Sequence, residues 1–284
     1  ISSTPGVPAA NWHLADYCSG TPGVEAREGY SVERFLSAGV SAAEVAAPRI
    51  KVLTYNLYWW NLFGQGGGRG GVAGKNIANY SKDEPFDLMG FQECEDVAWP
   101  LRDAKAAGMP GDYATIVGQH AIALAYRKEA FDLLEQGSAD VAEDGAAQHF
   151  GRRSVIWVRL THKASKRPIF FINHHGPTPV NSGGICGSSG TSYNLLKAVA
   201  ENARVGDAVV LVGDFNAWSN DPEGKWLEEV GRLDCHIPHV FSNPVIDDVW
   251  GIDNFFATCL TAVQKQVMPK GGSDHNALSV VFEV

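Results

Sequence analysis

The sequence lacks several patterns that mark common functional classes. No apolar run reaches the roughly 18 residues that a membrane-spanning helix needs, so we expect no membrane span. The chain has five cysteines but no Cys-x-x-Cys pair, which leaves a zinc or thioredoxin-type centre without support. The Gly-x-Ser-x-Gly motif of many serine hydrolases and the Gly-Lys-Ser/Thr ending of a P-loop are also missing.

Concentrated positive charge is absent too. The formal net charge is −9, and no cluster of lysine and arginine stands out. This argues against a broad electrostatic surface for nucleic acid. It does not exclude a nuclease, because a site that holds a divalent cation must itself be rich in carboxylates. With 284 residues, 45% hydrophobic and 19% charged, the composition is that of a globular protein with an ample core.

The cysteines and the first residues of the chain bear on the cellular compartment of the protein. Cys94 follows a strand-like apolar segment, and we expect it to be a core thiol. The odd number of cysteines means that at least one is free or pairs between chains. The chain starts without Met or an apolar signal segment, and Asn79-Tyr80-Ser81 is a formal glycosylation sequon. These features slightly favour a secreted or lumenal protein.

The chain divides into two regions of different composition. Residues 1–48 are rich in proline and glycine, and we expect them to form an extension packed on a domain of residues 49–284. Within that domain, apolar runs predict strands at 50–56, 87–93, 121–127, 154–160, 168–174, 208–213 and 278–283. Helices are predicted at 73–81, 97–107, 190–204 and 222–231. The glycine-rich segment 64–71 is either a lid or a linker.

Polar side chains stand at the ends of several predicted strands. Asp214 and Asn216 follow the apolar run 208–212, and the two-residue period of a strand can place both on one side. The same motif is also typical of an Asx-type turn after a buried strand, and both interpretations can hold. A rigid strand end holds such groups still. The other polar ends, in chain order, are Asn56, Gln92-Glu93, His174-His175 and Asp274-His275. Five such ends in order along one chain predict a site.

The order of these residues resembles that of the endonuclease/exonuclease/phosphatase superfamily, which includes deoxyribonuclease I. The most specific pieces are Gly213-Asp214-Phe215-Asn216-Ala217 and Ser273-Asp274-His275. The resemblance covers roughly residues 49–284. It implies an α+β fold, a four-layer αββα sandwich in which helices flank two mixed sheets. It also implies a divalent-metal-dependent phosphoester hydrolase, acting as a phosphodiesterase, phosphatase or nuclease.

The resemblance assigns catalytic roles. His275 is expected to activate water with Asp253 as its carboxylate partner, a pairing that suits a general base near neutral pH. Asp214 and Asn216 are expected to orient that water and bind a phosphate oxygen. His175 would donate a proton or a hydrogen bond to the transition-state oxygens or the leaving group.

A second set of residues is expected to serve a metal ion. Glu93 is the first candidate ligand, because Mg²⁺ prefers carboxylate oxygen. Asn56 would hold Glu93 or a metal-bound water, and Asp274 is expected to be a metal or water ligand. The cofactor implied is Mg²⁺, with Mn²⁺ or Ca²⁺ as alternatives.

Three residues are candidates for substrate binding. In a strand His174 and His175 point to opposite faces, so only one is expected in the site. The neighbouring motif favours His175, although the spacing in deoxyribonuclease I would favour His174, which we keep as a candidate. Arg153 could clamp a phosphate by a bidentate contact, and Trp218 is placed to line the pocket. Trp59 and Trp60 form either an aromatic wall beside the site or part of the core, and the core is favoured for at least one of them.

Departures from deoxyribonuclease I bear on the substrate. Gly118 and His120 stand where that enzyme has a groove-reading Tyr and a Glu partner for its first catalytic His. With no basic patch, a small-molecule or lipid-type phosphoester is slightly favoured over nucleic acid. A disulfide between Cys235 and Cys259 is also implied by the resemblance. The alternatives are a non-hydrolytic binding module on the same fold, or a different reaction of metal-bound water.

Overall fold

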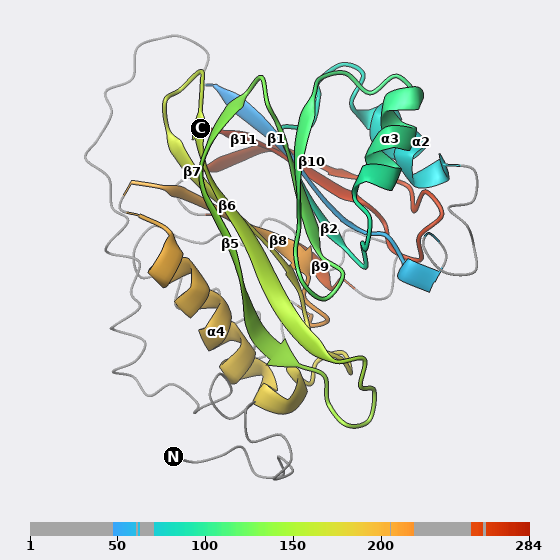
Figure 1. Ribbon diagram of the computed structural model, residues 1–284, viewed down its shortest axis with the longest axis vertical. Coiled ribbons are helices and arrows are strands. Elements are labelled where there is room, and N and C mark those ends of the chain that lie inside the picture. The colour runs from blue at the N-terminus through green and yellow to red at the C-terminus, as the bar shows by residue number, and fades with distance from the viewer. Residues whose placement is uncertain (1–47, 61, 63–70, 205, 219–250, 258–259) are drawn as a thin grey trace.

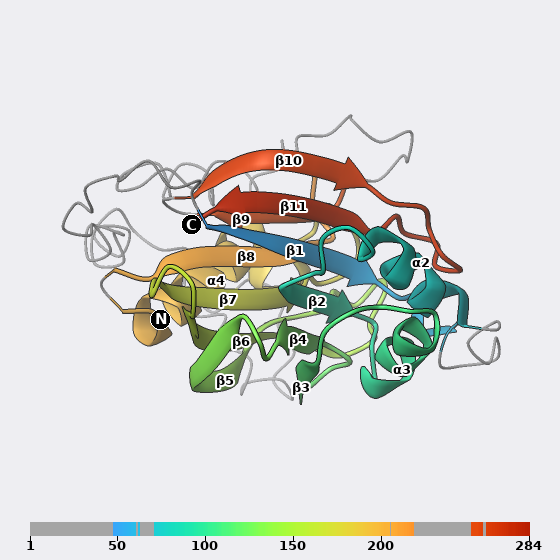
Figure 2. The same cartoon turned by 90° about the horizontal axis from the view of Figure 1, so that it is seen from above.

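The computed structural model describes residues 48–60, 62, 71–204, 206–218, 251–257 and 260–284. In this part of the chain, two mixed β-sheets pack face to face and helices lie on their outer faces (Figures 1 and 2). The predicted four-layer sandwich is therefore confirmed. Residues 1–47 of the expected extension, the predicted helix at 222–231 and the expected Cys235–Cys259 pair lie outside the described residues.

The first sheet has six strands in the order β10-β11-β1-β2-β4-β3. Its bounds are Arg49–Asn56 (β1), Leu88–Gln92 (β2), Tyr113–Val117 (β3), Ala123–Arg127 (β4), Thr261–Val267 (β10) and Leu278–Glu283 (β11). β1 and β2 run parallel, and every other neighbouring pair runs antiparallel. β1 and β2 therefore end at the same edge of the sheet.

The second sheet has five strands in the order β5-β6-β7-β8-β9. Its bounds are Phe131–Glu143 (β5), Arg152–His162 (β6), Pro168–His175 (β7), Ala208–Asp214 (β8) and Asp253–Ala257 (β9). Here β7 and β8 are the parallel pair, and the other neighbours are antiparallel.

Alternating side chains build the layers. In β7, Phe171 faces the other sheet and joins the central core, whereas Phe170 and Ile172 face α4 (Gly187–Asn202). This alternation follows from the two-residue period of a strand, and it decides later which side chains reach the site. The outer face of the six-stranded sheet is covered by α2 (Val72–Tyr80) and α3 (Ala98–Ala106). No helix among the described residues is long and apolar enough to cross a membrane.

All seven predicted strands are present, and so are the three predicted helices within the described residues. The four strands that the sequence did not predict are β3, β5, β9 and β10, and each is an edge strand. Edge strands bury less surface and carry polar residues, so most of them lack the apolar runs of central strands. In β10, for example, Gln264 and Lys265 are exposed.

The two sheets approach each other closely behind the strand ends. A Cβ atom at Gly90 would stand 2.6 Å from a methyl carbon of Val212, so only glycine permits this spacing. Beside it, the Gln92 amide donates to Oδ1 of Asn173 (2.6 Å), and Asn173 donates to the carbonyls of Phe91 and Ala123. These buried amides tie the sheets together directly below the polar strand ends, because buried polar groups need such partners.

Candidate active site

The polar strand ends predicted from the sequence meet at one edge of the sandwich. Asn56 and Gln92 are register partners at the ends of β1 and β2, and His175 and Asp214 are partners at the ends of β7 and β8. β9 begins opposite Asp214, which brings Asp253 to the same level. The segment before β11 joins them through Ser273, whose hydroxyl donates to the Asn56 carbonyl (2.7 Å).

These ends line a pocket of about 680 Å³. The predicted site residues in its lining are Glu93, Arg153, His175, Asp214, Asn216, Asp274 and His275. Asn56 and Asp253 lie just behind them, each hydrogen-bonded to a lining residue.

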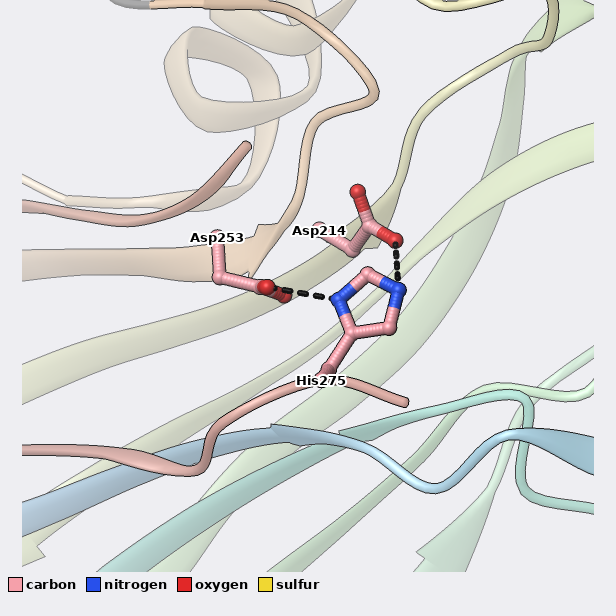
Figure 3. A group of neighbouring side chains, drawn as sticks. All are labelled: Asp214, Asp253 and His275. Atoms are coloured by element: carbon pink, nitrogen blue, oxygen red, sulfur yellow. Dashed lines mark hydrogen bonds and ion pairs between the residues drawn. The ribbon is translucent and has the colours of Figure 1, made fainter. Parts of the chain in front are cut away.

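His275 forms a dyad with Asp253 beside Asp214 (Figure 3). Nδ1 of His275 lies 2.7 Å from Oδ2 of Asp253, and because a carboxylate can only accept, this nitrogen carries a proton. Nε2 lies 3.8 Å from Oδ2 of Asp214 and 3.9 Å from Oδ1 of Asp274. The preceding Ser273 hydroxyl accepts the His275 backbone N–H (3.0 Å) and fixes the loop.

Burial alone would lower the pKa of His275, but the carboxylates of Asp253, Asp214 and Asp274 together raise it to about 10. The pKa of Asp214 is also raised, first by its complete burial and then by the neighbouring charge of Asp253. Without a cation, His275 and Asp214 therefore keep their protons to a higher pH than they would in water.

Asp214 is held by two amides. Its Oδ1 accepts the backbone N–H of Asn216 (2.9 Å), and its Oδ2 accepts the side-chain amide of Asn56 (2.9 Å). Asn216 has a left-handed backbone with φ of 47°, and its side chain donates to the carbonyl of Gly176 (3.0 Å). The Asp-x-Asn motif is therefore a tight turn that also presents Asp214 to the pocket, and both readings of the motif hold at once.

Asn56 links the two halves of the site. Its amide nitrogen donates to Oε1 of Glu93 (3.1 Å) as well as to Asp214, and its amide oxygen accepts the backbone N–H of Tyr58 (2.9 Å). The other oxygen of Glu93, Oε2, accepts the backbone N–H of Trp59 (2.9 Å). This geometry fits Asn56 as the residue that holds Glu93, rather than as a direct metal ligand.

The donor set fits a hard divalent cation. Ligand atoms of Asp214, Asp253 and His275 all lie within 4.8 Å of one another, and Glu93 is joined to Asp214 through the amide of Asn56. Carboxylate oxygens predominate, as Mg²⁺, Mn²⁺ and Ca²⁺ require. Burial, followed by the charge of Asp253, raises the pKa of Asp214, and a nearby cation would stabilise its charged form. The Asp274 side chain lines the pocket and is 55% exposed, and its Oδ1 lies 3.9 Å from Nε2 of His275.

His175 enters the site from β7, as preferred from the sequence. Nη1 of Arg153 lies 3.0 Å from Nδ1 of His175, and Nε2 of His175 lies 3.7 Å from Oδ2 of Asp214. Burial, followed by the positive charge of Arg153, lowers the pKa of His175 well below its usual value. The side chain is therefore a neutral imidazole, and of the two roles predicted for it, donation of a hydrogen bond fits this state.

The bidentate phosphate clamp predicted for Arg153 is wrong. Its Nε and Nη2 donate to Oδ1 and Oδ2 of Asp144 at 2.8 Å and 3.0 Å, so the fork that would hold a phosphate already holds a carboxylate. Arg153 is only 8% exposed.

The assignment of His174 to substrate binding is also corrected. His174 is fully buried, its Nδ1 lies 3.3 Å from the Ser154 carbonyl, and its ring packs against Phe215. It shares the face of β7 that turns to α4, together with Phe170 and Ile172, because alternate residues of a strand point the same way. Burial lowers its pKa to about 3, so it remains a neutral core residue.

The aromatic lining also differs from expectation. Trp218 is 38% exposed but does not belong to the pocket lining, and its backbone N–H donates to Oδ1 of Asn181 (2.9 Å). Trp59 and Trp60 do line the pocket, and their rings meet edge to face at 4.8 Å. The aromatic-wall alternative is therefore the correct one for both.

Several lining residues were not singled out from the sequence. They are Tyr58, Glu95, Gln148, Phe150 and Thr178, and two of them, Gln148 and Phe150, lie in the connection between β5 and β6. Asp144, fully buried behind Arg153, was missed as well. Since β5 is an edge strand without an apolar run, no sequence signal placed this connection beside the site.

Comparison with known proteins agrees with this geometry. The model of the Endonuclease/Exonuclease/phosphatase family matches residues 58–275. A family protein of known structure from Bacteroides thetaiotaomicron is 21% identical, with 84% of this chain and 98% of that chain covered and a TM-score of 0.62. A mannosyl-6-phosphatase from Bacteroides thetaiotaomicron VPI-5482 is 20% identical, with 82% and 99% covered and a TM-score of 0.60.

More distant structures share the same architecture. The human Nocturnin catalytic domain is 16% identical, with 84% of this chain and 95% of that chain covered and a TM-score of 0.58. No curated protein sequence matches the chain. The match over most of the described sandwich, together with the Asp253–His275 dyad and Asp214 at its strand ends, makes this chain a member of the endonuclease/exonuclease/phosphatase family.

Proposed function

We propose that this protein is a Mg²⁺-dependent phosphoester hydrolase in which His275 activates the attacking water. One observation carries the proposal: the Asp253–His275 dyad turns its Nε2 toward the buried carboxylate of Asp214 in a pocket that Glu93 also lines. A general base needs a partner that fixes its tautomer, and Asp253 supplies one at 2.7 Å.

Each residue of the pocket has its own proposed role in hydrolysis. Glu93 and Asp214 would hold the cation, whose chemistry is to neutralise phosphoryl oxygens and to acidify bound water. Nε2 of His275 would take the water proton, and Asp253 would stabilise the resulting imidazolium. His175 and Asn216, which line the same pocket, would donate hydrogen bonds to the phosphoryl oxygens as negative charge develops there.

The proposed substrate is a small-molecule or lipid-type phosphoester rather than a nucleic acid polymer. The net charge is −9, and the pocket lining includes the carboxylates of Glu93, Glu95 and Asp274, none of which attracts a polyanion. Two aromatic side chains of the lining are open to solvent, Trp60 at 54% and Phe150 at 65%. They offer apolar surface for the organic part of a substrate. Relatives include a mannosyl-6-phosphatase and a protein complexed with a single-stranded DNA product, so the test must separate these classes.

The experiment is hydrolysis of bis-p-nitrophenyl phosphate, hexose 6-phosphates and supercoiled plasmid with Mg²⁺, Mn²⁺, Ca²⁺ or EDTA. We expect turnover of a small substrate that EDTA abolishes and that His275→Gln lowers by about 10³-fold or more. His149→Gln is the matched control, because this histidine is absent from the pocket lining. Metal binding without turnover of any substrate would instead support the non-hydrolytic module.

The aromatic rim has its own test. Replacing Trp60 or Phe150 with alanine is expected to raise KM for p-nitrophenyl esters several-fold while leaving turnover of methyl phosphoesters unchanged. Val117→Ala is the control, since Val117 is an exposed apolar residue outside the pocket. Efficient plasmid cleavage by the wild-type protein would contradict the small-substrate proposal.

A further inference from the structure

Asp144 is a fully buried carboxylate to which the proposed hydrolysis gives no role. Its Oδ1 accepts hydrogen bonds from Nε of Arg153 (2.8 Å) and the backbone N–H of Thr178 (2.7 Å). Its Oδ2 accepts from Nη2 of Arg153 (3.0 Å) and the backbone N–H of Phe150 (2.8 Å). A carboxylate with this many short hydrogen bonds is held in one orientation, and it holds the groups that donate to it.

These hydrogen bonds join two segments from different parts of the chain. Phe150 lies in the connection between β5 and β6, residues 144–151, whereas Thr178 follows β7. The two segments also contact each other directly. The backbone N–H of Gly145 donates to the Thr178 carbonyl (2.6 Å), and the Thr178 hydroxyl donates to the Gln148 carbonyl (2.7 Å). Gln148, Phe150 and Thr178 line the pocket, and we call these three residues the β5–β6 wall.

The β5–β6 wall lies across the pocket from the general base. In the strand order β5-β6-β7-β8-β9, Asp253 begins β9 at one end of the row and binds His275, whereas the connection 144–151 lies at the other end. His175 and Asp214, at the ends of β7 and β8, lie between them. A phosphoryl group bound at these two central residues would therefore have His275 on one side and the wall on the other.

This arrangement decides which part of a substrate meets the wall. In phosphoryl transfer the attacking and leaving oxygens lie roughly in line, with the phosphorus between them. Water activated by His275 attacks from the β9 side, so the ester oxygen that departs points toward the β5–β6 side. There the Phe150 side chain is 65% exposed and offers apolar surface to an organic group.

We propose that the β5–β6 wall binds the leaving group of the substrate and that Asp144 is the positioning residue that fixes this wall. The leaving group that fits is an uncharged organic alcohol, because Phe150 supplies apolar surface and Gln148 and Thr178 supply neutral polar groups. That the bound group leaves rests on the proposed hydrolase function. Its binding and the rigidity of the wall can both be measured without turnover.

Two diesters with the same leaving group test the assignment. Ethyl p-nitrophenyl phosphate and phenyl p-nitrophenyl phosphate both release p-nitrophenol, and they differ only in the group that stays on phosphorus. Phe150→Ala is expected to raise KM for both esters by the same factor, about 3- to 10-fold, with little change in kcat. Val117→Ala, outside the pocket, should change neither. A larger loss on the phenyl ester, or an unchanged KM for both, would refute the assignment.

A double-mutant cycle tests the role of Asp144. Asp144→Asn presents an N–H group where a carboxylate oxygen accepts, so Phe150 loses its anchor. KM for both esters should rise about as far as in Phe150→Ala, and the double variant should have nearly the same KM as either single variant. Effects on KM that multiply in the double variant would show that Asp144 does not act through Phe150.

Hydrogen exchange of the wild-type protein tests the same role without any variant, because Asp144→Asn leaves Arg153 buried without its partner and can fail to fold. The backbone amides of Phe150 and Thr178 should exchange about 10²-fold or more slowly than in an unstructured peptide. Unprotected amides at these two positions in the folded protein would refute the positioning role.

A substrate analogue separates this proposal from the proposed function. 4-Nitrobenzyl phosphonate has no ester bond to cleave, and with Mg²⁺ it should change the NMR signals of Gln148 and Phe150, whereas methylphosphonate should not. These changes without hydrolysis of any ester would refute the proposed function alone. Hydrolysis without these changes would refute the leaving-group wall alone, and the absence of both would refute both proposals.

Discussion

The metal-free protein should lose stability as the pH rises from 7 to 9, because of one histidine. The pKa of His275 is raised from 6.5 to about 10 in the folded protein. A raised pKa contributes stability that is fully present below the unfolded value and is lost as the pH rises through the folded value. Between pH 7 and 9, the folded protein thus keeps a proton that the unfolded chain has released.

The expected size follows from this one proton. The free energy of unfolding changes by about 1.4 kcal/mol per pH unit for each proton of difference, so two units give at most about 2.7 kcal/mol. Asp214, with a pKa raised to about 7 by burial and the charge of Asp253, also titrates at the lower edge of this window. His174, His175 and Cys94 act mainly outside it. The lowered pKa values of His174 and His175 matter below about pH 6.5, and the raised pKa of Cys94 matters above its ordinary value of 9.0.

Urea unfolding in EDTA at pH 7, 8 and 9 measures the effect. His275→Gln is the comparison, because subtracting its free energies from those of the wild type cancels the groups that the two proteins share. We expect the wild type to lose about 2 to 2.5 kcal/mol more than the variant over this range, and Asp253→Asn to behave like the variant. Equal slopes in the two proteins would refute the reasoning that the carboxylates hold a proton on His275.

Three further predictions follow from the same contacts. At pH 8, Mg²⁺ binding should release a proton from the wild-type protein but not from His275→Gln, since the cation competes with the imidazolium for the carboxylates. Calorimetry in buffers of different ionisation enthalpy would measure the number of protons released. Equal proton release by the two proteins would count against the dyad. Asp253→Asn should lower kcat by about 10²- to 10⁴-fold with the fold intact, because the amide no longer stabilises the protonated imidazole of His275. Steady-state kinetics together with circular dichroism would test this. Near-normal turnover would show that Asp253 has no part in the mechanism. Gly176→Ala should destabilise the protein by about 1 to 3 kcal/mol, because its Cβ would overlap the Phe215 carbonyl. Gly108→Ala, with nothing within 4 Å of its Cβ but a positive φ that Gly176 lacks, measures backbone strain without overlap, and a smaller loss at Gly176 than at Gly108 would contradict the argument.

The sequence by itself determined the central strands and the order of the site residues. Apolar runs predict the buried strands because a strand covered on both faces must be apolar throughout. The motif around Asp214 and Asn216 predicts a tight polar turn, and the resemblance adds the partner of His275. These features are local or are carried by a short motif, so they can be recognised before the chain is folded.

Only the tertiary structure decided what each polar group touches. It placed His175 in the pocket and His174 in the core, paired Arg153 with Asp144, and left Trp218 outside the pocket lining. The sequence could not show these outcomes, because they depend on edge strands without apolar runs and on contacts between segments far apart in the chain. A residue type sets which hydrogen bonds and charges are possible, but burial and neighbours set which of them are made.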